Sequence, residues 1–250
     1  MSAILKRIFN VKKIIPRILV FVDYFPECGL NLGKWYLLLK VRKYSQLNSQ
    51  RLSKLYNLAK EIEKKRIRGA FVECGVWKGG SCAVMAFVSH KAESERKIWL
   101  FDSFEGMPEP REIDGKLVRQ WVGGALSGRL IPTGLNFASS EEVSKLLFEN
   151  FNFSRENIVI KKGWLQNTLP ASELEIGDIA LLHIDVDWYE STKICLDYLY
   201  DNIVPGGYLI LDDYNFFEGC KIAVDTFIRE RDLKIRLLRS DAEGVYFNKP

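Results

Sequence analysis

The chain has 250 residues, of which 47% are hydrophobic and 27% are charged. This length and composition predict one α/β domain with a small helical addition, and they exclude a chain that depends on disulfides or a metal to hold its core together. A formal net charge of +4 is too small to predict nucleic acid as a partner.

The N-terminal residues 1–25 combine basic side chains with a short apolar run, Ile18 to Val22. The run is far shorter than the roughly 20 residues that span a bilayer. Pro16, Arg17 and Asp23 interrupt it and no small-residue cleavage site follows, so it does not resemble a signal peptide. A basic helix here is compatible with peripheral membrane contact, a cap on the domain, an oligomer contact or a lid.

Residues 30–44 and 46–66 carry apolar side chains at three- and four-residue spacing, which is typical of amphipathic helices. The second pattern stops before Gly69, a residue that commonly follows a helix end. We therefore predict an N-terminal helical cap or lid over residues 1–67 and a main domain over residues 68–250.

After Gly69, short apolar runs alternate with helical patterns, as in a parallel sheet with helices on both of its faces. The predicted strands cover residues 70–74, 97–101, 157–160, 179–184, 208–211, 234–238 and 245–247. The predicted helices between them cover residues 81–91, 140–150, 190–201 and 218–230. Because no helical pattern separates the last two strands, we expect seven strands that are mostly parallel and end in an antiparallel hairpin.

The long segment 103–138 shows neither pattern, and loops of this length are often lids or binding loops. It holds Arg111, Arg119, Trp121 and Arg129 among glycines. An aromatic ring that can stack on a sugar, with arginines that bind hydroxyls or a phosphate, would suit a lid over a ligand. A solvated loop without a specific role explains the same residues, and both interpretations stay open.

The cysteines are scattered and contain no Cys-x-x-Cys pair. They are Cys28, Cys74, Cys82, Cys195 and Cys220. We expect buried free thiols rather than disulfides or metal ligands, and a location in the reducing cytoplasm.

Acidic side chains stand where the predicted parallel strands end. They are Glu73, Asp102, Asp185, Asp212 and Asp213, with Asp187 close behind. Ligands of open α/β sheets bind beyond these carboxyl ends of the strands. Carboxylates gathered at one edge repel one another unless cations or hydrogen-bond donors compensate.

The segment ECGVWKGGS, from Glu73 to Ser81, joins a strand to a helix, and its glycines allow the backbone to approach a ligand closely. It lacks the spacing of dinucleotide-binding and P-loop motifs. Glu73 favours a ligand ammonium over a phosphate, and Asp102 can accept both hydroxyls of a ribose. S-adenosylmethionine carries both groups, whereas NAD has no such ammonium. A plain strand–turn–helix connection capped by Ser81 is the alternative.

Asp185 and the pair Asp212–Asp213 end neighbouring predicted strands, so their carboxylates can converge on one ion. Oxygen ligands suit Mg²⁺, Mn²⁺ or Ca²⁺ rather than zinc. Strand alternation favours His183 as a packed residue near this site over a fourth ligand. Such an ion would lower the pKa of an acceptor hydroxyl, and Asp187 could take its proton during methyl transfer. Ordinary turn chemistry at strand ends is the alternative.

Five stretches of the chain resemble the TylF/macrocin O-methyltransferase family. They are FVECGVWKGGS (71–81), WLFDSFEGMPEP (99–110), KGWLQNTLP (162–170), IDVDWYEST (184–192) and VPGGYLILDDY (204–214). The resemblance covers residues 68–250 and implies a Rossmann-like class I methyltransferase that methylates sugar hydroxyls with S-adenosylmethionine and magnesium. Its acceptor would be a sugar or glycoside of a natural product or surface polysaccharide. It also implies a homo-oligomer, for which we expect a dimer.

The resemblance assigns site residues by their place in these motifs. It implies Asp185, Asp212 and Asp213 as ligands of Mg²⁺ or Mn²⁺ and Asp187 as the catalytic base. The expected cofactor-binding residues are Glu73, Gly75, Ser81, Asp102, Ser103, Gly163, Trp164, Gln166 and Asp185.

This chain departs from the family pattern at three positions. Val186 stands where glycine is usual, Trp188 where leucine is frequent, and His183 where arginine is common. Trp188 falls near the expected acceptor pocket, so the resemblance does not identify the acceptor.

Two other functions fit parts of the sequence. A glycosyltransferase could use Asp185-Val186-Asp187 to hold a metal against a nucleotide-sugar diphosphate, but this leaves the 73–81 loop and the Asp212–Asp213 pair unused. A non-catalytic S-adenosylmethionine-binding protein would not need metal ligands and a base together. Binding of S-adenosylmethionine rather than a UDP-sugar separates the first alternative from a methyltransferase.

Overall fold

The computed structural model of the chain describes residues 23–122 and 126–250, and the expected basic N-terminal helix lies largely outside them. In this described part, one seven-stranded sheet has the order β3-β2-β1-β4-β5-β7-β6. The strands are β1 (Ala70–Cys74), β2 (Ile98–Asp102), β3 (Ile158–Lys162), β4 (Ile179–Ile184), β5 (Ile203–Leu211), β6 (Leu238–Arg239) and β7 (Val245–Asn248). The helices are α3 (Leu32–Val41), α4 (Ser49–Lys65), α5 (Gly80–Lys91), α6 (Lys116–Val122), α7 (Ser140–Ser144), α8 (Leu165–Ile176), α9 (Tyr189–Leu199) and α10 (Glu218–Glu230).

The sheet has the predicted topology. Strands β1 to β5 are parallel, and β7 runs antiparallel to both β5 and β6. The chain moves outward from β1 through β2 to β3, and then returns to the other side of β1 with β4 and β5. The connections that follow β1 and β4 therefore diverge, which opens a crevice at the carboxyl ends of these two strands.

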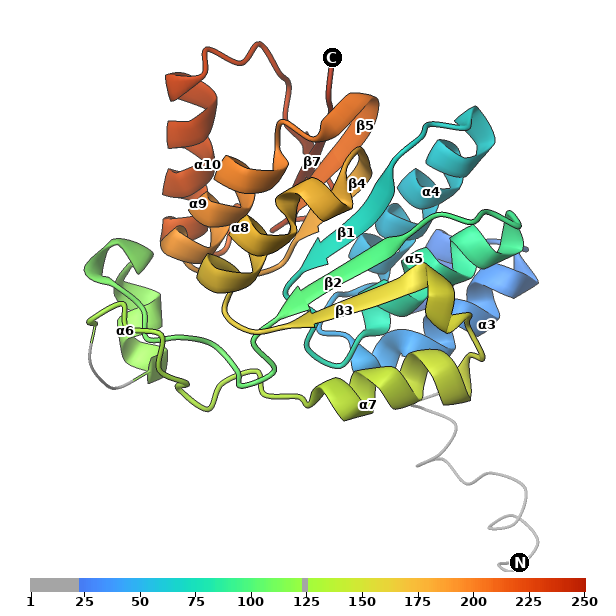
Figure 1. Cartoon of the computed structure of the whole chain (residues 1–250), viewed down its shortest axis with the longest axis horizontal. Coiled ribbons are helices and arrows are strands. Elements are labelled where there is room, and N and C mark those ends of the chain that lie inside the picture. The colour runs from blue at the N-terminus through green and yellow to red at the C-terminus, as the bar shows by residue number, and fades with distance from the viewer. Residues whose placement is uncertain (1–22, 123–125) are drawn as a thin grey trace, which may run out of the picture.

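Helices cover both faces of the sheet, as the continuous apolar runs of the strands predict. All residues of β1 and β4 are buried. Phe71 and Leu181 face the core shared with α3, α4 and α5, whereas Val72 and Leu182 face the core shared with α8, α9 and α10. Figure 1 shows these helices as two layers with the sheet between them.

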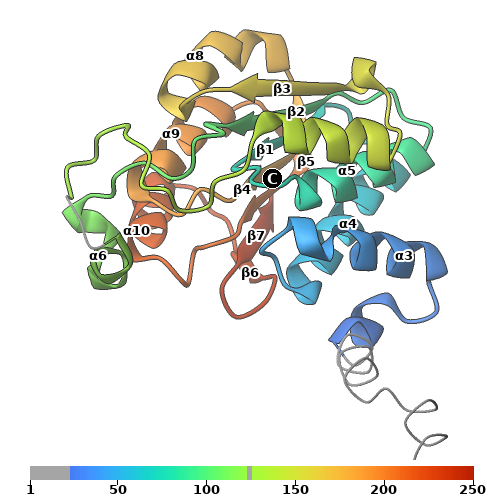
Figure 2. The same ribbon diagram turned by 90° about the horizontal axis from the view of Figure 1, so that it is seen from below.

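The N-terminal helices belong to the first of these layers. Asn48 caps α4 by accepting a hydrogen bond from the amide of Arg51, and Leu52, Leu55 and Ile62 form a buried stripe along the helix. Burial of each such side chain contributes about 1.5–3 kcal/mol. Helix α4 packs on α5, and the two views in Figures 1 and 2 place α3 and α4 beside α5. The helices predicted at 30–44 and 46–66 are thus confirmed.

Three segments differ from the prediction. Helix α8 was not among the predicted helices; it contains Pro170, and its buried residues Leu165, Leu169 and Ile176 keep helical spacing. The segment 103–138 contains the short helix α6, of which only Val118 is buried. The strand predicted at 234–238 is reduced to Leu238–Arg239, which are both exposed.

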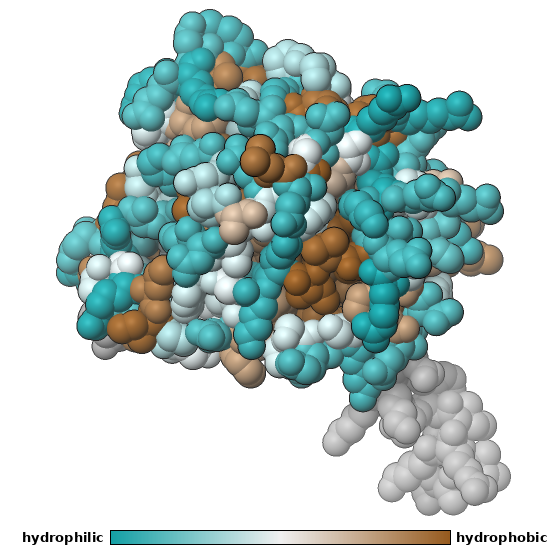
Figure 3. All heavy atoms as spheres, viewed as in Figure 1, coloured by the Kyte–Doolittle hydropathy of each residue, from teal (hydrophilic) through white to brown (hydrophobic). Residues whose placement is uncertain are grey.

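The surface and the thiols agree with the composition. Polar side chains cover most of the face in Figure 3, and apolar ones gather in a few places. All five cysteines are buried and free, as predicted. Within the described ranges, the helices are too short or too polar to cross a membrane.

Candidate active site

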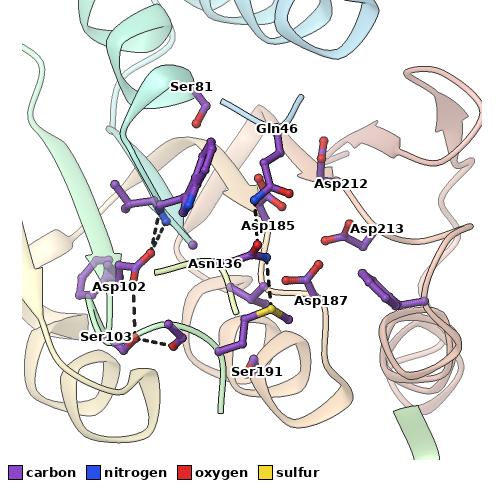
Figure 4. A pocket seen from close by; sticks show the side chains of 18 of the residues that line it. Gln46, Ser81, Asp102, Ser103, Asn136, Asp185, Asp187, Ser191, Asp212 and Asp213 are labelled. Carbon is purple, nitrogen blue, oxygen red and sulfur yellow. Dashed lines mark hydrogen bonds between the residues drawn. The ribbon is translucent and has the colours of Figure 1, made fainter. Parts of the chain in front are cut away.

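A cavity of about 310 Å³ lies at the carboxyl ends of β1, β2, β4 and β5. Of the predicted site residues, it brings together Gly75, Ser81, Asp102, Ser103, Trp164, Gln166, Asp185, Asp187, Asp212 and Asp213. Figure 4 shows two groups of residues on opposite sides of this cavity. One group is Asp185, Asp187, Asp212 and Asp213, and the other is Ser81, Asp102 and Ser103. The N-terminal segment completes the wall with residues 44–47 and Arg51.

The loop after β1 depends on Gly75. Its backbone has a φ of 87°, and a Cβ atom added there would lie 1.7 Å from the carbonyl oxygen of Asp185. The amide of Asp185 donates to the carbonyl of Cys74 over 2.9 Å. Only glycine allows this close approach of the two strand ends, which brings the loop next to the carboxylates.

Asp102 holds the same loop from the end of β2. Its Oδ2 accepts hydrogen bonds from the amides of Val76 and Trp77 over 2.7 and 2.9 Å, and its Oδ1 accepts one from Phe104 over 2.7 Å. Burial raises the pKa of Asp102, although these amides stabilise its charged form. Asp102 therefore shapes the loop as well as lining the cavity.

Glu73 does not reach the cavity wall. Its side chain is fully buried, with Oε1 2.8 Å from Nδ1 of His183 and Oε2 accepting a hydrogen bond from the Cys82 thiol. The expected contact with a ligand ammonium is not supported, because Glu73 points between β4 and α5. Gly163 also lies outside the cavity wall, where its amide donates to the carbonyl of Asp102.

His183 is a packed residue beside the carboxylates, as strand alternation predicts. It is fully buried, and its Nε2 lies 3.8 Å from Oδ1 of Asp212. Burial lowers the pKa of His183, but the carboxylates of Asp212 and Glu73 together raise it well above its usual value. The imidazole is thereby held between two acids.

Asp185, Asp212 and Asp213 each offer a carboxylate oxygen, and these oxygens lie within 4.8 Å of one another. Asp212 Oδ1 and Asp213 Oδ2 are buried and have no hydrogen-bond partner among the described residues. Burial and the neighbouring carboxylates raise the pKa values of Asp185 and Asp213 well above their usual range. Because this set contains only oxygen donors and is deficient in positive charge, it fits a hard divalent cation such as Mg²⁺ or Mn²⁺.

Asp187 lies beside this cluster in a left-handed conformation, with a φ of 61°. The amide of Trp188 donates to the carbonyl of Val186 over 2.7 Å and closes a tight turn around Asp187. The turn directs the carboxylate into the cavity (Figure 4). Burial and the charge of Asp212 raise the pKa of Asp187 to about 7, in spite of Arg51. Backbone strain of this kind is found at functional sites.

Arg51 is a site residue that the sequence analysis did not single out. Its guanidinium forms ion pairs with Asp212, Asp241 and Glu243 and lines the cavity. Its position in α4 gives no local signal for this role, because Asp212 lies 161 residues further along the chain.

The N-terminal segment also meets the 103–138 segment. Nε2 of Gln46 donates to Oδ1 of Asn136 over 2.8 Å, and both residues line the cavity. Figure 4 shows this pair in front of Asp185.

The 103–138 segment divides into two parts with different surroundings. Its exposed arginines pair with acids outside the cavity wall: Arg111 with Glu190, Arg119 with Glu112 and Arg129 with Glu109. Trp121 instead lines the cavity together with Phe216 and Phe217. The ring centroids of Trp121 lie 5.9 and 5.6 Å from those of these two residues. The aromatic part of the lid hypothesis is therefore supported, whereas the arginines are engaged elsewhere.

Trp188 supports this aromatic wall from behind. It is 2% exposed, packs edge-on against Phe217 with a centroid distance of 5.2 Å, and donates its Nε1–H to the carbonyl of Pro108. Trp188, which stands where the family often has leucine, thus contacts the aromatic part of the cavity wall through packing.

Comparisons with known proteins agree with this geometry. A model of the macrocin-O-methyltransferase (TylF) family matches residues 41–249. Demethyldecarbamoylnovobiocin O-methyltransferase from Streptomyces niveus is 31% identical over 82% of this chain and 76% of its own length. Mycinamicin III 3''-O-methyltransferase from Micromonospora griseorubida is 24% identical over 82% and 78%. The solved O-methyltransferase NovP has a TM-score of 0.69 and 32% identity, with 82% of each chain covered.

The sheet, the cavity and these matches define an O-methyltransferase that uses S-adenosylmethionine. The chain belongs to the macrocin-O-methyltransferase (TylF) family. The family match begins at residue 41 and so includes α4 and Arg51, beyond the range that the motifs alone indicate.

Proposed function

We propose that this enzyme uses a divalent metal ion to transfer a methyl group from S-adenosylmethionine to a hydroxyl of a sugar or glycoside. The main support is the carboxylate cluster Asp185, Asp212 and Asp213, which borders the same cavity as the loop after β1. A donor, an ion and an acceptor can meet there.

The donor part of the proposal rests on the residues between β1, β2 and β3. Gly75 allows the backbone to approach the methionine portion closely, and Ser81 lies beside it in the first turn of α5. Asp102 ends β2 and Ser103 follows it, where a ribose would lie. Trp164 and Gln166 follow β3 and would contact the adenine. Glu73 and Gly163 support this site through β4, α5 and β2 rather than by contact with the donor.

The reaction requires an acceptor oxygen that has lost its proton. Asp185, Asp212 and Asp213 would hold Mg²⁺ or Mn²⁺, and such an ion orients a hydroxyl and lowers its pKa. The Asp187 carboxylate is placed to take the proton, and its pKa of about 7 suits a base that works near neutral pH. Positioning of the two substrates in one cavity supplies much of the remaining acceleration.

The acceptor would enter beside Trp121, Phe216 and Phe217. A sugar ring can stack its apolar face on such aromatic side chains. Relatives act on glycosylated natural products: their names specify novobiocin, a rhamnosyl tetracenomycin and mycinamicin precursors. We extend this class, a glycoside of a small molecule or of a surface polysaccharide, to the present chain.

The proposal also includes the cellular setting. Five buried free thiols fit the reducing cytoplasm.

The exposed apolar residues Leu30, Leu32 and Tyr36 near or on α3 fit a homodimer contact. Gel filtration with light scattering would detect a dimer, and vesicle sedimentation would detect membrane contact through residues 1–22.

Calorimetric titration with S-adenosylmethionine, in the presence and absence of Mg²⁺, tests the donor site directly. We expect micromolar binding, followed by Mg²⁺-dependent methylation of a panel of glycosides. Binding of UDP-sugars without binding of S-adenosylmethionine would favour the glycosyltransferase alternative. Donor binding without turnover on any acceptor would favour a non-catalytic role.

A further inference from the structure

Arg51 of α4 contacts the carboxylate cluster from the N-terminal side. Its Nη1 lies 2.5 Å from Oδ2 of Asp212 and 3.4 Å from the backbone carbonyl of the same residue. The Arg51 side chain is 11% exposed and that of Asp212 is 3% exposed. A buried ion pair of this kind constrains both side chains more than a surface pair does.

The guanidinium is itself held from behind by the connection between β6 and β7. Arg51 Nε lies 3.2 Å from Oδ2 of Asp241, and Nη2 lies 3.0 Å from Oε2 of Glu243. Asp241 is fixed in turn, because its Oδ1 accepts hydrogen bonds from the amides of Glu243 and Gly244 and its Oδ2 accepts one from Asn48. Each of the three nitrogens of the planar guanidinium therefore lies within ion-pair distance of a different acid, and Nη1 is the one that also hydrogen-bonds to Asp212.

This arrangement decides which oxygen of Asp212 is free. Arg51 takes Oδ2, whereas Oδ1 is buried and has no hydrogen-bond partner among the described residues. Nε2 of His183 lies 3.8 Å from that oxygen, on the side of the sheet. Asp212 offers one carboxylate oxygen to the cluster formed with Asp185 and Asp213, and Oδ1 is the one that Arg51 leaves unpaired.

We propose that Arg51 is a positioning residue for the metal site. It fixes the Asp212 carboxylate so that one defined oxygen meets the ion, and it ties that ligand to the N-terminal helix and to the β6–β7 connection. This inference rests on the proposed metal-assisted function. Partners that orient a metal ligand commonly affect metal affinity as strongly as the ligands themselves.

Because the arginine side chain is planar and that of lysine is not, replacing one with the other distinguishes a positioning role from simple charge compensation. Arg51→Lys keeps a positive charge near the site but removes the fork that pairs with three acids at once. If Arg51 only balanced charge, lysine would replace it without loss. If it orients Asp212, the lysine variant should bind the metal ion more weakly.

The test measures Mn²⁺ binding by the full-length protein through the electron paramagnetic resonance signal of free Mn²⁺. We expect Arg51→Lys to weaken Mn²⁺ binding by about 10-fold or more. S-adenosylmethionine affinity, measured by calorimetry without metal, should remain that of the wild type, and the Mn²⁺ concentration for half-maximal rate should rise. Arg231→Lys, which alters a surface pair with Asp201, is the matched control and should change neither value.

Asp241→Asn is a second variant, which removes a support of Arg51 and leaves every proposed metal ligand in place. It should weaken Mn²⁺ binding in the same direction, even if Arg51→Lys does not fold. Wild-type Mn²⁺ affinity in the folded variants, or loss of donor affinity alone, would overturn the role of Arg51 only. Failure of the wild-type protein to bind Mn²⁺ would overturn the metal site itself, and the inference with it.

Discussion

Asp187 is defined by its backbone as much as by its carboxylate. The tight turn from Val186 to Trp188 holds it in the left-handed region and directs it into the cavity, two residues after Asp185. Its pKa of about 7 results from burial and from the charge of Asp212. The residue is therefore suited to accept a proton without itself completing the oxygen cluster.

Asp187→Asn should remove the base and retain the shape of the turn. We expect kcat to fall by roughly 10²–10⁴-fold, the usual contribution of a general base, with unchanged affinity for S-adenosylmethionine. Single-turnover methyl transfer and calorimetric donor binding measure the two quantities. Asp197→Asn, which alters a surface pair with Lys193, is the control. A variant that retains wild-type turnover would show that another group takes the proton.

At the scale of elements, α6 and the residues just before α10 form an aromatic part of the cavity wall, where we propose that the acceptor binds. Trp121 is 51% exposed and lies against Phe216 and Phe217, so a large aromatic surface is available to an incoming ligand. The arginines of the same segment are paired with neighbouring acids and are exposed to solvent.

Trp121→Ala should raise KM for the acceptor and leave donor affinity unchanged. A stacking contact is worth about 0.5–1.5 kcal/mol, which corresponds to a change of roughly 2- to 13-fold. Arg119→Gln should have little effect, because an exposed ion pair contributes little. Steady-state kinetics with one glycoside acceptor compare the two variants. Equal KM values for Trp121→Ala and the wild type would place the acceptor elsewhere.

Helix α4 links the fold to the site, because its buried stripe packs in the core and the same helix carries Arg51. Leu52 is fully buried, so Leu52→Ala should lower the free energy of unfolding by about 2–5 kcal/mol. Leu174→Ala, at a position that is 96% exposed, should change it by less than about 0.5 kcal/mol. Urea denaturation followed by circular dichroism measures both. A small effect at Leu52 would mean that α4 contributes little to the core.

At the scale of the whole molecule, the carboxylate cluster opposes folding when it has no cation. Asp185, Asp212 and Asp213 are close together and two of them have strongly raised pKa values, which reflects the cost of burying their charges. An ion that binds only the folded protein reverses this cost.

Mg²⁺ should therefore raise the melting temperature of the protein. At an ion concentration of about 100 times Kd the gain is about 2.7 kcal/mol, or roughly 5–10 °C for a chain of this size. Asp213→Asn should melt higher than the wild type without Mg²⁺, because it removes one repelling charge, and should lose the response to Mg²⁺. Differential scanning calorimetry measures both effects. An unchanged melting temperature of the wild type in Mg²⁺ would count against the ion site.

The sequence predicted the sheet and most of the cavity for a simple reason. Parallel strands end at one edge, so acidic residues that follow separate strands must converge there, as Asp185 and Asp212 do. It could not predict that Glu73 turns toward His183 and Cys82, since this depends on packing between β1, β4 and α5. Arg51 was missed because its contact spans the whole domain, and α8 because Pro170 resembles a helix end.

The contact between Gly75 and the Asp185 carbonyl has a consequence for redesign of the enzyme. The loop after β1 and the edge that carries the carboxylates meet at this backbone contact, in which there is no space for a side chain. A larger side chain at position 75, introduced to reshape the cavity for bulkier donor analogues, would displace Asp185. The wall formed by Gln46 and Leu47 belongs to a different part of the chain, so substitutions there leave the contact between Gly75 and Asp185 unchanged.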